Sequence, residues 1–223
     1  MKTLIAVVSN VLAIAIAAVA LAQPAHGQQA TAKTTPAAAP AAVRPQISVW
    51  ESWDYSFHDS RNSRTDCSYA LTVTAVTGDT ISVDMQNPRH CNIGALAEST
   101  VYDKDFNLMY AGMTAYRTNA FPLAVGKTWN QQFAYNTEAN TPVHNDVTAK
   151  VVATEKVTVP AGIFDAYKVV VERKYQSQYV SGTITETRWY APQAKNYVRR
   201  ISVDSASASN SQVSELTNYR HMR

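Results

Sequence analysis

Apolar and polar side chains alternate through most of the chain after residue 46. Around Trp53, Tyr55 and Phe57, for example, small or polar residues fill the positions between the rings. Successive side chains of a β-strand point to opposite faces, so this alternation predicts strands with one buried face. No segment shows a convincing helical period, and the best helix candidate is a short turn around residues 94–99. The alternation occurs at residues 47–57, 69–75, 81–85, 128–135, 147–159, 167–175, 183–190, 197–203 and 213–219.

Turn-forming residues separate these segments. Residues 77–80 break one run, Pro160-Ala161-Gly162 ends another, and Ser181-Gly182 comes before a third. About eight to ten strands joined by such turns predict an all-β fold, a single antiparallel sheet that is strongly curved into a half-barrel or closed into a barrel. Two residues interrupt the alternation: Trp50, which indicates a bulge or a second buried face, and Val152.

The N-terminus has the pattern of a secretory signal peptide. A basic second residue is followed by an unbroken apolar run at residues 11–22, and Ala25-His26-Gly27 fits a small-x-small cleavage site. We therefore expect a signal peptide at residues 1–27 with cleavage after Gly27, although Ala20-Leu21-Ala22 offers a second site. An uncleaved anchor is the alternative, but Ser9 and Asn10 interrupt the apolar run. The prediction is a periplasmic or secreted protein with no transmembrane span in the mature chain.

Residues 28–45 are mainly Ala, Thr, Pro and Gln, with no aromatic residue. Pro36, Pro40 and Pro45 prevent a continuous helix, so we expect a disordered, low-complexity linker. The remaining residues, 46–223, form the single predicted β-rich domain, which is large enough to fold without a metal.

Two cysteines remain after the signal peptide, Cys67 and Cys91. An even pair in an exported chain predicts a disulfide. The pair flanks the alternating segments 69–75 and 81–85, so the bridge closes the open end of a hairpin and stabilises it by about 3–4 kcal/mol in the chain-entropy model. The alternative, a redox thiol, lacks a Cys-x-x-Cys motif.

Most catalytic and binding motifs are missing from the sequence. The 20 Lys and Arg residues against 17 Asp and Glu are too balanced for a dedicated nucleic-acid binder. There is no Gly-x-Ser-x-Gly, no glycine-rich phosphate loop, and no histidine spacing suited to zinc. Asp103, Asp105 and Asn107 imitate a calcium loop, but Leu108 stands where Gly is required, which favours a hairpin turn. We therefore expect no enzyme, no cofactor and no metal.

Short basic clusters occur at Arg199-Arg200 and at Lys168, Arg173 and Lys174. We interpret them as solvated strand faces that protect sheet edges. The alternative is contact with anionic head groups or lipopolysaccharide.

The aromatic residues allow two interpretations. They can fill the core of a curved sheet, or they can line an apolar groove in the mouth of a half-open barrel. The candidates for groove residues are Trp129, Phe133, Phe164, Trp189 and Tyr190.

Three segments carry a family resemblance: Phe121–Trp129, Val157–Val169, and Trp189–Pro192 with Tyr197–Arg199. Their phrases Gly-Lys-x-Trp, Val-Pro-Ala-Gly-x-Phe and Trp-Tyr-x-Pro resemble an uncharacterised family of exported, mostly proteobacterial β-rich domains. The resemblance covers about residues 120–203. It implies a β-rich fold, similar to the half-barrels that carry lipoproteins, and supplies no catalytic residue.

Two functions follow as hypotheses. The first is a non-catalytic periplasmic binding or carrier module whose concave aromatic face holds an apolar or amphipathic ligand. The second is a structural or interaction protein of the cell envelope that contacts another envelope protein through a sheet edge.

Overall fold

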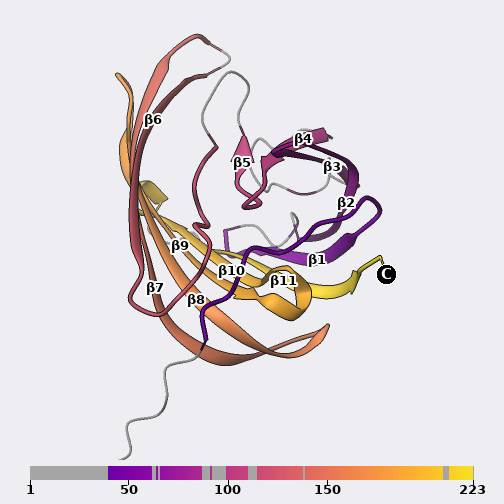
Figure 1. Cartoon of the computed structure of the whole chain (residues 1–223). Coiled ribbons are helices and arrows are strands. Elements are labelled where there is room, and N and C mark those ends of the chain that lie inside the picture. Colours follow the sequence, from indigo (N-terminus) through magenta and orange to yellow (C-terminus); the bar gives the residue numbers. More distant parts are fainter. Residues whose placement is uncertain are drawn as a thin grey trace, which may run out of the picture. The chain divides into compact units, whose positions relative to one another are not determined.

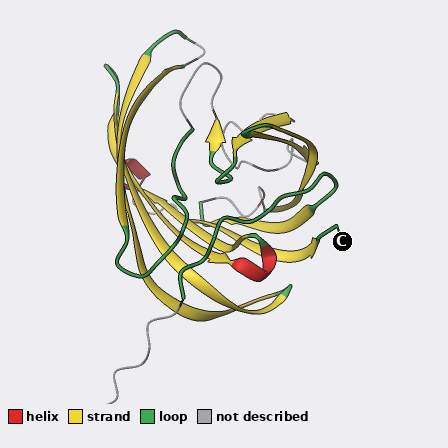
Figure 2. Cartoon of the chain, viewed as in Figure 1, coloured by secondary structure: helices red, strands yellow, loops and turns green. Residues whose placement is uncertain are grey.

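The strands of the computed structural model pair into one antiparallel sheet, which curves round in Figure 1 and is coloured yellow in Figure 2. The structure describes residues 40–61, 64, 66–86, 91, 99–109, 115–137, 139–207 and 211–222. Within them the sheet has eleven strands in the order β5-β4-β3-β2-β1-β11-β10-β9-β8-β7-β6. The edge strands β5 and β6 do not pair with each other, so the sheet is open, as in a half-barrel. The prediction of a single curved antiparallel sheet is confirmed.

Each predicted strand segment overlaps an observed strand. The elements are β1 (Ser52–Asp59), β2 (Cys67–Thr77), β3 (Thr80–Gln86), β4 (Ser99–Asp103), β5 (Leu108–Met109), β6 (Thr128–Asn136), β7 (Pro142–Val159), β8 (Gly162–Gln176), β9 (Ser181–Ala191), β10 (Asn196–Asp204) and β11 (Ser211–Arg220), with short 3₁₀ helices at Pro192–Ala194 and Ser205–Ser207.

The connectivity explains why the sheet has a covered concave side. β1 to β5 form one meander and β6 to β11 form another, and the pairing of β1 with β11 joins the two. The chain leaves the sheet at one edge, β5, and enters it again at the other edge, β6. The connection must therefore cross between the two edges, and its described part, residues 115–127, packs on the sheet.

Two hydrophobic clusters hold the sheet. The first gathers inward-facing residues of the β1–β4 arm, such as Trp53 and Leu71, together with Phe164. The second packs Leu123 of the connecting segment against β7 to β9 residues such as Val169. Both clusters follow the period-two pattern of the sequence, because alternate side chains of each strand reach the same face.

The two interruptions of the alternation have different causes. Val152 lies in a β-bulge, since the β7–β8 register shifts between Val151 and Ala153, and its side chain is exposed. Trp50 is neither in a bulge nor buried, so that prediction is wrong. It adopts a left-handed backbone conformation (φ 70°) in a turn before β1, and its ring is 60% exposed.

The turn before β9 also differs from the prediction. Ser181 and Gly182 belong to the strand, and the chain reverses at residues 177–180 instead. The Ser177 N–H donates to the carbonyl of Val180 (2.8 Å), and the Ser177 Oγ accepts hydrogen bonds from the Tyr179 and Val180 N–H groups. Hydrogen bonds to Ser177 therefore stabilise the chain reversal that Ser181-Gly182 was predicted to form.

The predicted disulfide is present. Cys67 begins β2, Cys91 follows β3, and the bridge between them ties the open end of this hairpin, with Cα atoms 5.5 Å apart. The signal peptide, its cleavage site and residues 94–98 of the helix candidate lie outside the described residues, while its last residue, Ser99, begins β4. The last residues of the predicted linker are described: Ala42 is buried and exchanges backbone hydrogen bonds with Leu123.

Candidate functional site

A cavity of about 340 Å³ lies on the concave side of the sheet. Strands from both arms contribute to it, which is possible only on the side toward which the sheet curves. We call it the concave pocket. Its walls combine aromatic rings, aliphatic side chains and charged groups: Tyr69, Leu71, Tyr102, Phe106, Leu108, Tyr116, Thr118, Asn119, Tyr135, Arg173, Ile184, Glu186, Arg188, Asn196, Tyr197, Arg200, Ser202 and Gln212.

The charged centre of the pocket is a carboxylate held by two guanidiniums. Glu186 and Arg188 alternate on β9, so both face the pocket, and Arg200 lies opposite Arg188 on β10. Glu186 Oε2 accepts hydrogen bonds from Arg188 Nη2 (2.6 Å), Arg188 Nε (2.8 Å) and Arg200 Nε (3.0 Å). Glu186 is only 3% exposed. A buried carboxylate is thus fully paired, as burial requires.

Electrostatics fixes the protonation state of this cluster. Burial by itself raises the pKa of Glu186, but the charges and hydrogen bonds of Arg188 and Arg200 outweigh burial and hold that pKa well below its usual range. Glu186 is therefore ionised at neutral pH. A carboxylate whose proton affinity is so low is a poor general acid or base near neutrality.

The connecting segment closes over this cluster. The Tyr116 hydroxyl donates to Glu186 Oε1 (3.4 Å), and Thr118 Oγ1 accepts from Arg188 Nη1 (3.0 Å). The Arg173 guanidinium lies 5.4 Å from the centroid of the Tyr116 ring, within the range of a cation–π contact. Segment 115–127 therefore supplies part of the pocket wall.

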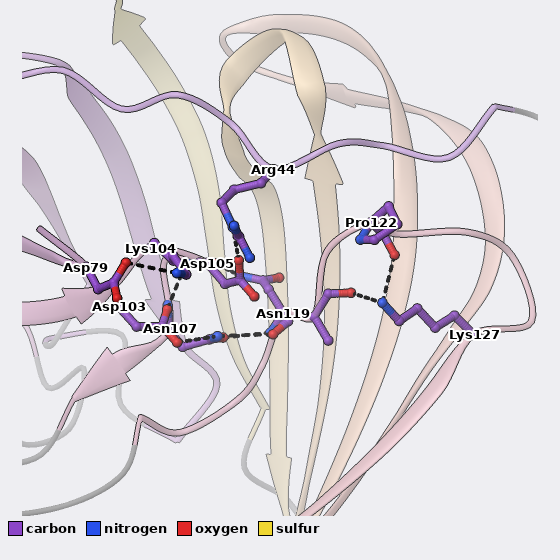
Figure 3. A network of polar contacts seen from close by, with 10 residues as sticks. Arg44, Asp79, Asp103, Lys104, Asp105, Asn107, Asn119, Pro122 and Lys127 are labelled. Atoms are coloured by element: carbon purple, nitrogen blue, oxygen red, sulfur yellow. Dashed lines mark hydrogen bonds and ion pairs between the residues drawn. The ribbon is translucent and has the colours of Figure 1, made fainter.

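A polar network fixes that segment to the β4–β5 turn (Figure 3). Asp103 Oδ1 accepts the N–H groups of Asp105 and Asn107, both at 2.9 Å, which confirms the predicted turn. The buried Asn107 Nδ2 donates to the Asn119 carbonyl (3.0 Å), and Asn107 Oδ1 accepts the Asn119 N–H (2.7 Å). Farther along the segment, Lys127 Nζ donates to the Pro122 carbonyl (2.9 Å). The residues that imitate a calcium loop thus position the pocket wall.

A stack of three tyrosines borders the pocket, and two of them, Tyr69 and Tyr197, line it. Tyr55 stacks between Tyr69 and Tyr197, with ring centroids 5.2 and 4.9 Å away. The hydroxyls of Tyr69 and Tyr197 are 3.1 Å apart, and the Tyr55 hydroxyl donates to the Tyr197 carbonyl. Burial raises the pKa of Tyr55 and of Tyr69 well above the usual value, so both stay neutral.

None of the five aromatic residues predicted to line a groove lines the concave pocket. Phe164 and Trp189 lie in the first hydrophobic cluster, while Trp129 and Tyr190 lie in the second with half-buried Phe133 packed against it. The structure therefore divides the five between two clusters.

The interpretation of the basic residues as solvated strand faces that protect sheet edges is only partly right, and its edge part is wrong because β8 and β10 are interior strands. Lys168 and Arg199 lie over the ring of Trp189, 5.2 and 5.5 Å from its centroid, on the face opposite the pocket. Arg173 and Arg200, however, line the pocket, so for these two the interpretation is wrong. Adjacent residues of a strand face opposite sides, which is why Arg199 and Arg200 separate.

Sequence reasoning missed Glu186 and Arg188 altogether. The signal that could have found them is a pair of charges at alternate positions within a segment otherwise rich in threonine and aromatic residues. Local pairing could not have added Arg200, because regular pairing from Ala191 and Asn196 puts Arg199 opposite Arg188, and only the register shift between Tyr197 and Arg199 brings Arg200 there.

A second depression, of about 460 Å³, lies beside Cys67 and is more open to solvent. Its polar pair, His58 Nδ1 and Asp66 Oδ2 at 2.8 Å, is exposed. Because its polar groups face water, we take the concave pocket as the candidate site. In the described part of the chain, no helix is both long and apolar enough to cross a bilayer, and no three His, Cys, Asp or Glu side chains form a metal-binding group.

Comparison with known proteins gives structural likeness only. No family model and no curated protein matches the chain, so the family suggested by the three motifs stays a prediction. A Bacteroides fragilis protein named as exported, with a YmcC-like fold, is 14% identical over 82% of this chain and 100% of its own (TM-score 0.46). A Parabacteroides distasonis chain named as a lipoprotein is 13% identical over the same shares (0.47). The hypothetical lipoprotein YmcC of Escherichia coli is 8% identical over 77% of this chain and 86% of its own (0.43).

Proposed function

We propose that this protein is a non-catalytic binding module of the cell envelope that holds an amphipathic ligand in the concave pocket. The observation that carries the proposal is the composition of the pocket wall, where aliphatic and aromatic side chains surround a buried charged cluster. Small-molecule sites typically combine an apolar lining with a few placed polar groups. The low pKa of Glu186 favours binding over acid–base catalysis.

Native mass spectrometry of protein purified from the periplasm without detergent tests this function. We expect a reproducible additional mass that organic solvent removes, on a chain shortened by its signal peptide and lighter by the two disulfide hydrogens. A clean mass from every preparation would contradict the proposal and favour an interaction protein of the envelope.

Two matched variants of β9 locate the ligand. Ile184 lines the pocket, whereas its neighbour Thr185 is exposed on the other face. Ile184→Trp should fill the cavity and abolish the additional mass, and Thr185→Trp should leave it unchanged. Circular dichroism of both variants verifies that they fold. An additional mass that persists in folded Ile184→Trp would place the ligand elsewhere.

A further inference from the structure

The concave pocket has more positive than negative charge. Three guanidiniums, those of Arg173, Arg188 and Arg200, face one carboxylate, that of Glu186, and the other lining side chains are uncharged. A structural ion pair needs one cation for each carboxylate, and a buried charge without a partner is costly. The excess is thus unexplained by folding alone.

The unmatched polar atoms of the pocket wall are hydrogen-bond donors. Arg200 uses only its Nε, on Glu186, and both of its Nη groups lack an acceptor among the described residues. Arg173 Nε and Asn196 Nδ2 are buried without a partner, and Asn196 is only 4% exposed. Donors without acceptors call for a ligand that brings acceptor oxygens.

Another buried carboxylate, outside the pocket, has a different environment. Glu51 is fully buried and pairs with one ammonium, Lys195 Nζ at 2.5 Å. In the part of the chain that the structure describes, Glu51 Oε2 is an acceptor without a partner, and His221 Nδ1, 3.8 Å from Glu51 Oε1, is unmatched as well. The Glu51 site thus leaves a carboxylate oxygen without a donor, whereas the two unmatched buried atoms of the pocket, Arg173 Nε and Asn196 Nδ2, are both donors that suit an anion.

The remainder of the wall suits a hydrocarbon. Leu71, Phe106, Leu108 and Ile184 line the same cavity as the guanidiniums, together with the rings of the pocket tyrosines. Burial of apolar ligand surface against such side chains stabilises a complex by about 25 cal/mol per Å² before the costs of association.

We propose that the concave pocket binds an amphipathic acid, with its carboxylate or phosphate head on the Nη groups of Arg200 and its hydrocarbon along the apolar wall. This inference rests on the proposed function and assigns the chemical class of its ligand. Arg173 adds positive charge at the same cavity, while Arg188 neutralises and positions Glu186. A guanidinium suits this role because its planar donors match the oxygens of a carboxylate or phosphate.

Isothermal titration calorimetry of the delipidated protein tests the assignment with four probes: dodecanoate, dodecyl phosphate, dodecanol and inorganic phosphate. Either acidic probe should bind at least tenfold more tightly than dodecanol and than inorganic phosphate. The preference between dodecanoate and dodecyl phosphate tells which head group the site favours.

Arg200→Gln should weaken the better acidic probe at least tenfold and leave dodecanol unchanged. This variant should fold, because Glu186 keeps Arg188 as a one-to-one partner. Arg199→Gln, the adjacent residue on the opposite face, is the matched control and should change binding less than twofold. Arg173→Gln, which removes no ion pair among the described residues, gives a second reading and should weaken the acidic probe severalfold.

The outcomes separate the two proposals. Equal affinity for dodecanol and dodecanoate would overturn the acidic head group but leave the binding function standing. Inorganic phosphate binding as tightly as dodecyl phosphate would overturn the hydrocarbon part. Unchanged affinity in folded Arg200→Gln and Arg173→Gln would overturn the assigned residues. Binding of no probe would contradict both proposals.

Discussion

The two faces of the β9–β10 hairpin use the same kinds of residue in opposite ways. On the pocket face, Arg188 and Arg200 hold a buried carboxylate. On the outer face, Lys168 and Arg199 cover the ring of Trp189, and their charged ends pair with half-exposed or exposed carboxylates. The comparison teaches that burial of the partner, rather than the presence of an arginine, decides how much an ion pair contributes.

The largest expected difference between the faces concerns their carboxylates. Glu186→Gln leaves two guanidiniums in the pocket without a counter-charge and should destabilise the fold by about 3–5 kcal/mol. Glu215→Gln, which removes the outer-face partner of Arg199, should cost about 0–1 kcal/mol. Urea denaturation of both variants measures the two values. Equal losses of unfolding free energy in the two variants would contradict the difference between the two faces.

The stability that Glu186 contributes should also depend on pH. The folded pKa of Glu186 lies below its unfolded value, so the cluster contributes its full stability above the usual glutamate range, near pH ~4.3, and loses it as the pH falls further. The gap in unfolding free energy between wild type and Glu186→Gln should therefore shrink from about pH 7 to about pH 3. A gap that stays constant on acidification would show that Glu186 is not ionised in the folded protein.

On the outer face, Trp189 should contribute more to the stability of the fold than the charged side chains around it. Trp189→Phe removes the hydrogen bond from the indole Nε1 to Glu155 Oε1 (2.5 Å) and part of the ring under Lys168 and Arg199. We expect a loss of about 1–2 kcal/mol, measured by urea denaturation, because Glu155 is partly exposed. Binding of acidic probes should not change. If it weakened as much as in Arg200→Gln, the division into an inner binding face and an outer structural face would be wrong.

The smallest expected effect is that of Arg199→Gln on stability. Its ion pair with Glu215, at 3.3 Å, is more than a third exposed on the arginine side, so the loss should be below about 1 kcal/mol. This loss of stability should also vanish in about 1 M salt, because the Debye length is then only about 3 Å and exposed charges are screened. Denaturation at low and high salt checks this, with Arg200→Gln as the comparison, whose effect should persist in salt.

The sequence determined the strands, the β2–β3 hairpin, its disulfide and the turn at residues 103–107. These features depend on neighbours in the chain, through period-two alternation, turn residues and an even cysteine pair. The same local reasoning misplaced the turn before β9, because Ser177 and Gly182 both suit a turn and only the pairing of β8 with β9 selects one.

Only the tertiary structure decided which face of each strand lies inside. Alternation divides Arg199 from Arg200 but does not say which of them turns inward, since both faces of residues 183–203 mix apolar and charged side chains. The answer comes from contacts between residues far apart in the chain: the β1–β11 pairing, which joins the two meanders, and the segment that brings Tyr116 and Thr118 over Glu186. A site built from such long-range contacts has no local signature, because each of its residues resembles an ordinary strand residue until the sheet curves around it.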